Sequence, residues 1–300
     1  MIDCLVIGGG PAGLTAALYL ARYHISVLVA DDGNSRADLI PMSRNVAGFP
    51  DGISGPDLLS IMRSQTALYP IDHIRERVIS LERENGEFVA LTAHREIRST
   101  TVLLATGVVN RRPEMSPETH NEALRLGLLR YCPICDGYEI TDQAVAVIGN
   151  SPHAMNEAEF IRSYTQNVTL ISPDLTPAIE EGLRKQLANL GLKFLKGSAK
   201  FEIEGNHILV ELPSGTYKYN AVYPALGSDV RSELGIEIGG AVSSEGCLKV
   251  DSHQATNIEG LYAAGDVVKG LDQIANAIGH GSLAAAAIRS YVATKRSILR

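Results

Sequence analysis

A glycine-rich turn near the N-terminus constrains the fold of this chain more than any other feature. The apolar residues 4–7 predict a buried strand, residues 14–23 predict a helix, and the turn between them holds Gly8, Gly10 and Gly13. In this pattern the first glycine permits a tight turn, the second lets the backbone approach a pyrophosphate, and the third lets helix and strand pack closely. We therefore expect a Rossmann-like dinucleotide-binding fold to begin here.

The same turn predicts the contacts of a bound dinucleotide. Pro11 and Ala12 stand at the start of the helix, where free N–H groups and the positive end of the helix dipole attract a phosphate. Asp31 follows the next predicted strand, residues 27–30, and its carboxylate can accept a hydrogen bond from a ribose hydroxyl. The pattern does not distinguish FAD from NAD, and a glycine-rich turn without a ligand is the alternative interpretation.

The order of strand, turn and helix occurs a second time along the chain. Residues 144–148 predict a strand, residues 154–164 a helix, residues 168–172 another strand, and residues 178–190 another helix. Such a repeat predicts a second parallel sheet covered by helices.

Two further segments complete the predicted fold. Residues 74–104 alternate apolar and polar side chains around a turn at Asn85 and Gly86, which is typical of an antiparallel β-meander. Small residues dominate a final predicted helix over residues 273–294. We predict an α/β fold class with two Rossmann-like dinucleotide-binding folds of the three-layer ββα type, the second inserted into the first, and a β-meander.

Composition excludes several classes of function. The 300 residues, of which 45% are apolar and 20% charged, are ordinary for a globular protein of two domains. A net charge of -7 lacks the positive field that nucleic-acid binding needs. Charged residues interrupt every apolar run before the roughly 18 residues of a membrane span, and the N-terminus lacks a cationic leader segment. We expect a cytoplasmic protein with no nucleic acid and no membrane among its partners.

Two of the four cysteines have the spacing of a redox dithiol. Only two residues separate Cys132 from Cys135, so their sulfurs can close a small ring, and a cysteine near a helix N-terminus has a lowered pKa. A structural zinc site is one alternative, although Cys4 and Cys247 do not form a second Cys-x-x-Cys pair. An inert, coincidental pair is the other.

These motifs together resemble the flavoprotein disulfide reductases that contain two dinucleotide folds. The resemblance implies FAD as the cofactor, with Asp266 bonding the flavin ribitol or phosphate and Asn45 approaching the isoalloxazine ring. It also implies that the N-terminus of the last helix points at the flavin pyrimidine. Beyond the first glycine turn, the residues that carry this part of the resemblance are Asn45, Thr106, Gly107, Gly265 and Asp266, and the helix N-terminus that it places at the flavin is at Gln273 and Ile274.

The dithiol segment is similar to that of the low-molecular-weight thioredoxin reductases of bacteria and plants, and the similarity covers nearly the whole chain. It implies that Cys135 lies nearest the flavin and makes a thiolate charge-transfer contact. Cys132 would then be the outer thiol that attacks a substrate disulfide, and Asp136 the general acid. It further implies a homodimer that acts on a thioredoxin-like protein or a small disulfide. A helix-capping or turn role is the alternative for Asp136.

The same resemblance implies a nested arrangement of domains. Residues 1–113 and 228–300 are expected to form a discontinuous FAD-binding domain. Residues 114–227 are expected to form an inserted dithiol and pyridine-nucleotide-like domain that carries Cys132 and Cys135.

The second glycine turn departs from the pattern that binds NADPH in this family. Gly149 and the small residue Ala154 are kept, but Asn150 and Ser151 place side chains where a pyrophosphate would approach. Residues 172–177 contain no arginine, so NADPH would lack its charge-assisted contacts to the 2′-phosphate. NAD(P)H is therefore a doubtful cofactor. Within this segment, Asp174 could instead accept from a 2′-hydroxyl, but we interpret it as a solvated loop carboxylate.

The favoured function is FAD-dependent reduction of a thioredoxin-type disulfide, with ferredoxin, NADH or an unidentified compound as the electron donor. Three alternatives remain: an ordinary NADPH-dependent thioredoxin reductase, an oxidase that passes electrons from a small dithiol to oxygen, and a non-enzymatic redox sensor. Related oxidases often have histidine after the second cysteine, whereas this chain has Asp136, as the reductases do.

Overall fold

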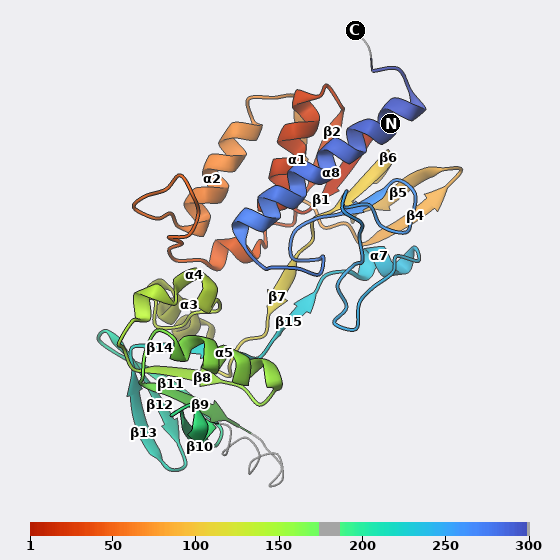
Figure 1. Ribbon diagram of the computed structural model, residues 1–300. Coiled ribbons are helices and arrows are strands. Elements are labelled where there is room, and N and C mark those ends of the chain that lie inside the picture. The colour runs from red at the N-terminus through yellow and green to blue at the C-terminus, as the bar shows by residue number, and fades with distance from the viewer. Residues whose placement is uncertain (174–186, 299–300) are drawn as a thin grey trace.

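The computed structural model describes residues 1–173 and 187–298. Figure 1 shows two lobes, connected where strands β7 (Val108–Asn110) and β15 (Ser228–Val230) run side by side as an antiparallel pair. The predicted helix over residues 178–190 falls largely outside the described residues, and Asp174 does so entirely.

The first lobe is built on a seven-stranded sheet with the strand order β3-β2-β1-β6-β5-β4, in which β16 also pairs with β6. The outer edge of β6 is shared: its first half pairs with β5 in antiparallel orientation, and its second half pairs with β16 in parallel orientation. A late segment of the chain thus lies inside the N-terminal sheet. The strands are β1 (Ile2–Ile7), β2 (Val27–Ala30), β3 (Ile71–Ile74), β4 (Ser80–Glu84), β5 (Glu87–Leu91), β6 (Glu96–Leu104) and β16 (Leu261–Ala263).

Both faces of this sheet are covered, which explains the uninterrupted apolar run of β1. Cys4 and Val6 pack in one core cluster with α1 and α8, whereas Leu5 and Ile7 pack in another on the opposite face. Figure 1 shows α1, α2 and α8 together on one side of the lobe. The helical segments are α1 (Pro11–Arg22), η1 (Arg36–Leu39), α2 (Gly55–Thr66), α7 (Glu233–Glu237) and α8 (Ile274–Lys295).

The predicted meander is confirmed for β4, β5 and β6 but wrong at its start. Asn85 and Gly86 form the expected turn, with φ of 52° and 87°. Ile74, however, ends β3, which pairs in parallel with β2 on the other side of the sheet. Alternation of apolar and polar side chains reports half-burial of a strand and does not identify its neighbour, so the sequence did not show this change of partner.

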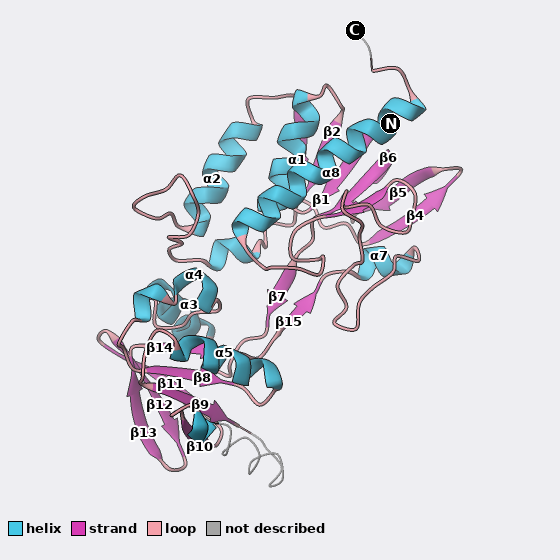
Figure 2. Cartoon of the chain, in the orientation of Figure 1, coloured by secondary structure: helices cyan, strands magenta, loops and turns pink. Residues whose placement is uncertain are grey.

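The second lobe joins a parallel sheet, ordered β10-β9-β8-β14, to an antiparallel sheet, ordered β11-β12-β13. Figure 2 shows α3 and α4 on the side of this lobe that faces the first. Among the described residues of this lobe, the helical segments are α3 (Pro117–Arg125), α4 (Pro133–Asp136), η2 (Tyr138–Ile140) and α5 (Pro152–Arg162). Its strands are β8 (Val145–Ile148), β9 (Val168–Ser172), β10 (Lys193–Lys196), β11 (Lys200–Glu204), β12 (His207–Leu212), β13 (Gly215–Tyr219) and β14 (Ala221–Pro224).

The α/β fold class with two Rossmann-like folds is confirmed. Each lobe contains a parallel strand-helix-strand unit, β1-α1-β2 in the first and β8-α5-β9 in the second. In both units a glycine turn connects the first strand to the helix. Across residues 1–173 and 187–298, no helix combines the length and the apolar character needed to cross a membrane.

Candidate functional site

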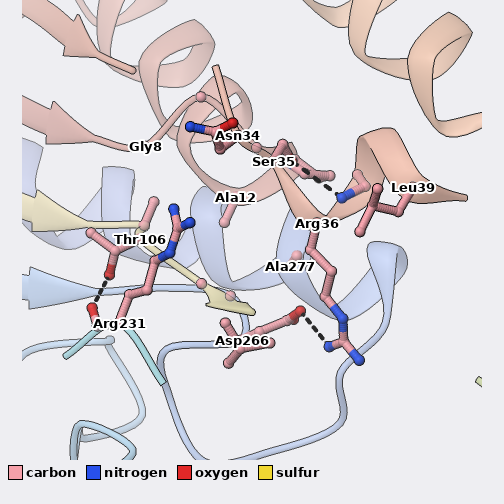
Figure 3. A pocket seen from close by; sticks show the side chains of 18 of the residues that line it. Gly8, Ala12, Asn34, Ser35, Arg36, Leu39, Thr106, Arg231, Asp266 and Ala277 are labelled. Carbon is pink, nitrogen blue, oxygen red and sulfur yellow. Dashed lines mark hydrogen bonds and ion pairs between the residues drawn. The ribbon is translucent and has the colours of Figure 1, made fainter. Parts of the chain in front are cut away.

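A cavity of about 630 Å³ extends from the first glycine turn to the two cysteines of the second lobe. Its walls come from segments that are far apart in the sequence, and Figure 3 shows several of them converging. All the predicted site residues except Gly13 line it. They are Gly8, Gly10, Pro11, Ala12, Asp31, Asn45, Thr106, Gly107, Cys132, Cys135, Asp136, Gly265, Asp266, Gln273 and Ile274.

Glycine is required for two different structural reasons at the three glycine positions of the first turn. Gly8 has a φ of 113°, and a Cβ there would overlap the carbonyl oxygen of Ala105. A Cβ at Gly13 would overlap the carbonyl oxygen of Gly8, so both positions are fixed by backbone packing. A Cβ at Gly10 would meet only Ser35 Oγ, at 3.3 Å. Gly10 therefore keeps space open toward the cavity.

The start of α1 is left free for a ligand. Gly10 is the N-cap residue of α1 and offers no side-chain acceptor to the first amides of the helix. Uncapped N–H groups at a helix N-terminus, together with the helix dipole, form a binding site for phosphate.

Asp31 is held against the same turn. Its Oδ1 accepts a hydrogen bond from Gly33 N at 3.2 Å, and its carboxylate lies so close to Gly9 that a Cβ there would overlap it. Arg63 Nη2 approaches Asp31 Oδ2 at 3.8 Å. The carboxylate is thus held at the wall of the cavity, and the sequence predicts a contact to a ribose for this residue.

Arg36 reaches across the cavity to two acidic residues, as Figure 3 shows for Asp266. Its Nη1 lies 3.1 Å from Asp266 Oδ2 and 2.7 Å from Asp272 Oδ2. Burial, together with the charge of Asp272, raises the pKa of Asp266, and the Arg36 guanidinium opposes that shift. Arg36 could not be recognised from the sequence, because it belongs to no motif there and its partners lie over two hundred positions away in the chain.

Thr106 and Gly107 fix the crossing of two chain segments. Thr106 Oγ1 donates a hydrogen bond to the Arg231 carbonyl oxygen at 2.6 Å, and Arg231 N donates to the Gly107 carbonyl oxygen at 3.0 Å. Gly107 has a φ of 66°, in the left-handed region that favours glycine. The main role of these residues at the cavity is to hold the backbone of its wall in place.

Cys132 and Cys135 form a disulfide at the cavity wall, with their Cα atoms 5.3 Å apart. Cys132 is the N-cap residue of α4, and its Sγ accepts a hydrogen bond from Cys135 N at 3.2 Å. Gln273 Nε2, at the start of α8 in the first lobe, lies 3.2 Å from the Cys132 sulfur and 3.3 Å from the Cys135 sulfur. Asn45 Nδ2 donates to Gln273 Oε1 at 3.0 Å and so orients the amide.

The carboxyl group of Asp136 is bound by side chains of its own lobe, the second. The Tyr223 hydroxyl donates a hydrogen bond to Asp136 Oδ1 at 2.7 Å, and Arg130 Nη1 lies 3.3 Å from Asp136 Oδ2. Burial raises the pKa of Asp136, while Arg130 and Tyr223 act in the opposite direction. Neither partner was predicted from the sequence. A tyrosine in an apolar strand, such as Tyr223, is typical of an ordinary core residue.

The helix that follows the second glycine turn, α5, begins differently from α1. Ser151 is the N-cap residue of α5, and its Oγ accepts a hydrogen bond from Ala154 N at 3.4 Å. A Cβ at Gly149 would lie 2.6 Å from Ala154 Cβ and 2.7 Å from the Ala225 carbonyl oxygen. Gly149 and Ala154 are therefore required for packing, while a side chain of the helix itself caps its N-terminus.

Two dinucleotide folds, a cavity that begins at an uncapped helix, and a disulfide in its wall define a flavoprotein of the disulfide reductase class. Residues 2–281 match the family described as pyridine nucleotide-disulphide oxidoreductase, and the chain belongs to that family.

Similar proteins agree with this assignment. The chain is 31% identical to a thioredoxin reductase of Streptomyces coelicolor, over 89% of this chain and 86% of that protein. It is 30% identical to a thioredoxin reductase of Aquifex aeolicus, over 99% of this chain and 95% of that protein. The chain is accordingly a thioredoxin reductase-like flavin disulfide oxidoreductase, an enzyme that binds FAD.

Solved structures share the fold over nearly the whole chain. The crystal structure of HlmI has a TM-score of 0.87 and 28% identity, and the match covers 98% of this chain and 93% of that one. A thioredoxin reductase from Streptococcus pyogenes has a TM-score of 0.85 and 28% identity, with 98% and 99% covered.

The residues of the cavity fit FAD. The uncapped N-terminus of α1 suits its pyrophosphate, and the carboxylate of Asp31 suits a ribose. Gln273, whose amide contacts both sulfurs, lines the same cavity. Arg36 also lines this cavity, where its guanidinium is paired with Asp266 and Asp272.

Proposed function

We propose that this protein reduces a thioredoxin-type disulfide through Cys132 and Cys135, and that NADPH bound at the second fold is not its electron donor. The substrate class is supported by the relatives, which are named thioredoxin reductases. The observation that carries the proposal about the donor is the hydrogen bond from Ala154 N to Ser151 Oγ at the start of α5.

The roles of the dithiol follow from chemistry at the cavity wall. When bound, FAD supplies the electron pair that opens the Cys132–Cys135 disulfide. We propose that Cys132, as thiolate, attacks the substrate disulfide and forms a mixed disulfide, and that Cys135 then attacks the Cys132 sulfur and releases the reduced substrate. Asp136 gives a proton to a leaving sulfur, and Gln273 Nε2 donates to the sulfurs and stabilises their negative charge.

The second fold is a poor site for NADPH for two reasons. Ser151 Oγ already occupies the acceptor position at Ala154 N, so a pyrophosphate would have to displace it. Residues 172–177 also offer no guanidinium to a 2′-phosphate. Donors that do not need this turn, such as ferredoxin, NADH bound differently or another reductant, suit the chain better.

An anaerobic titration of the purified yellow protein tests the donor. We expect NADPH at micromolar concentration to leave the flavin absorbance nearly unchanged, and one of NADH or reduced ferredoxin to bleach it. Rapid bleaching of the flavin absorbance by micromolar NADPH would contradict the proposal about the donor. Reoxidation of the reduced enzyme by oxygen, with a small dithiol consumed in proportion, would favour the oxidase alternative. A single turnover with a disulfide would favour a sensor.

The order of the two sulfurs is tested by absorbance. If Cys135 lies next to the flavin, Cys132→Ser should leave its thiolate free and enhance the long-wavelength charge-transfer absorbance, whereas Cys135→Ser should abolish it. The opposite pattern would reverse the two roles.

We also propose the domain division at residues 1–113, 114–227 and 228–300. Its support is that the seven-stranded sheet draws strands from the first and last of these segments, while β8 to β14 all come from the middle one. Proteolysis near β7 and β15 should release the middle segment as a folded fragment, and cleavage within it first would contradict the division. The homodimer is a further part of the proposal, and sedimentation equilibrium tests it.

A further inference from the structure

The core of the second lobe contains a buried phenol whose partner is Asp136. Tyr223 lies in β14, is fully buried, and donates its hydroxyl proton to Asp136 Oδ1 at 2.7 Å. Phenylalanine would fill the same apolar space, so the hydroxyl is not needed for packing. A buried hydroxyl group must find a partner, and here the partner is the residue that follows Cys135.

A second donor serves the other carboxylate oxygen. Arg130 Nη1 lies 3.3 Å from Asp136 Oδ2, and Arg130 Nε donates to the Gly127 carbonyl oxygen at 2.8 Å, which fixes the guanidinium. Both side chains are mostly buried, with exposed fractions of 17% for Arg130 and 16% for Asp136. Each oxygen of the carboxylate therefore has its own donor, an arrangement that stabilises the negative charge.

Other charges around this group act against the anion. Burial raises the pKa of Asp136, and the Glu139 carboxylate raises it further. Burial also raises the pKa of the partner phenol, Tyr223, and the charges of Asp136 and Glu157 add to this effect. The phenol therefore stays neutral and remains a hydrogen-bond donor. Glu157 is itself paired with the exposed His153, at 3.3 Å.

We infer that Tyr223 is a positioning residue for the proton that reduction of the dithiol requires. This inference rests on the proposed role of Asp136. When an electron pair enters the Cys132–Cys135 disulfide, the S–S bond breaks, and one sulfur takes the proton of the Asp136 carboxylic acid while the other stays a thiolate. Asp136 becomes a carboxylate, and its new charge is met by the O–H of Tyr223 and by Arg130.

The position of Asp136 agrees with this role. Asp136 lines the same cavity as Cys132 and Cys135. Its backbone N–H donates to the Cys132 carbonyl oxygen at 3.3 Å, which fixes the backbone of Asp136 next to the dithiol. Without Tyr223 the carboxyl group would lose the bond that turns it toward β14. The hydroxyl thus fixes the direction of the carboxyl group and, together with Arg130, opposes the rise in its pKa that burial causes.

The test is Tyr223→Phe, with Tyr219→Phe as the matched control. Tyr219 is also buried in the second lobe, but its hydroxyl bonds Thr169 and not the dithiol segment. Oxidised enzyme is mixed anaerobically with one equivalent of dithionite, and the return of the oxidised-flavin band reports electron transfer to the disulfide. The rate is measured across neutral and alkaline pH, with FAD content as the check on folding.

A general acid works only while protonated, so the rate falls as pH rises through its pKa. Loss of a hydrogen bond to the carboxylate raises that pKa, so we expect Tyr223→Phe to shift the alkaline limb up by about one pH unit. On the low-pH plateau, where Asp136 is protonated in both enzymes, we expect the transfer to be about tenfold slower, because the acid is weaker and no longer held in place. Arg130→Gln should shift it in the same direction, and Tyr219→Phe should shift nothing. In an Asp136→Asn background, Tyr223→Phe should have no further effect.

The outcomes separate the inference from the proposed function. A slow Asp136→Asn enzyme with a Tyr223→Phe profile like that of the wild type overturns the inference alone. An Asp136→Asn enzyme as fast as the wild type removes the proposed acid, and the inference falls with it. A tenfold loss in Tyr223→Phe without any change in the pH profile shows a structural role only and also overturns the inference.

Discussion

The two glycine turns of this molecule keep the same packing but treat the helix that follows in opposite ways. Gly8 and Gly149 both sit where a side chain would strike backbone, so both turns retain the small residue that their sheets require. At Gly10 the first turn leaves the amides of α1 without a side-chain cap, whereas Ser151 caps α5. The second turn thus keeps its packing with fewer glycines than the first.

The largest effect is expected from a side chain at the open position. Gly10 has extended backbone, with φ -81° and ψ -174°, so valine fits its conformation but projects toward the cavity. Gly10→Val should weaken FAD binding by about a hundredfold or more, because several hydrogen bonds to a charged phosphate are lost. The FAD-to-protein ratio after gel filtration measures the loss.

The matched change in the other turn is Ser151→Val. It should leave the FAD content unchanged, since Ser151 does not line the cavity. If the two valine variants lost FAD equally, the contrast between the turns would be wrong.

A moderate effect is expected when the second turn is made to resemble the first. Ser151→Gly frees Ala154 N, and the rate of flavin reduction by NADPH should rise several-fold, up to about tenfold, the value of one hydrogen bond to a charged group. Stopped-flow reduction with NADPH measures it.

Ser116→Gly is the control for this gain. Ser116 caps α3 in the same lobe by accepting from Thr119 N at 3.1 Å, so its loss removes the cap of a different helix. Equal rates in both glycine variants would show that loosening of the lobe, and not the freed amide, is responsible.

The smallest effect concerns the charge at the start of α5. The hydrogen bond to Glu157 raises the pKa of His153. A raised histidine pKa stabilises the fold fully below the unfolded value of about 6.5, and this contribution is lost as pH rises through the folded pKa. His153→Ala should therefore lower the free energy of unfolding by about 0.5 kcal/mol in acid and by less in alkali.

Urea denaturation at the two pH values measures this difference. His153→Gln, which stays neutral but keeps a donor, should show little dependence on pH relative to alanine. A cost that is the same at both pH values would remove the ion pair as its source.

The sequence predicted the parts of the molecule that depend on local patterns. The first turn, the strand over residues 27–30 and the Cys132–Cys135 pair were found because fixed spacing reports a turn, a strand or a small ring. The partners of the site residues were not found. Arg36 and Tyr223 gain their meaning only from residues brought close by the tertiary fold, at separations of 230 and 87 residues.

The contact of Gln273 with both sulfurs shows the same limit. Motif resemblance placed this residue beside the flavin, but its contact with the disulfide depends on how the two lobes face each other. No spacing along one chain encodes that arrangement. The start of the meander failed for a related reason, since Ile74 pairs with a strand that precedes it by more than forty residues.

The shared outer edge of β6 also sets the order in which a growing chain can assemble. Half of that edge stays unpaired until β16 (Leu261–Ala263) is synthesised, so the N-terminal sheet must wait for the last segment of the chain. The second lobe is contiguous from α3 to β14 and can close its sheets while the first is still incomplete. During synthesis the dithiol would therefore reach its folded surroundings before the cavity beside it exists.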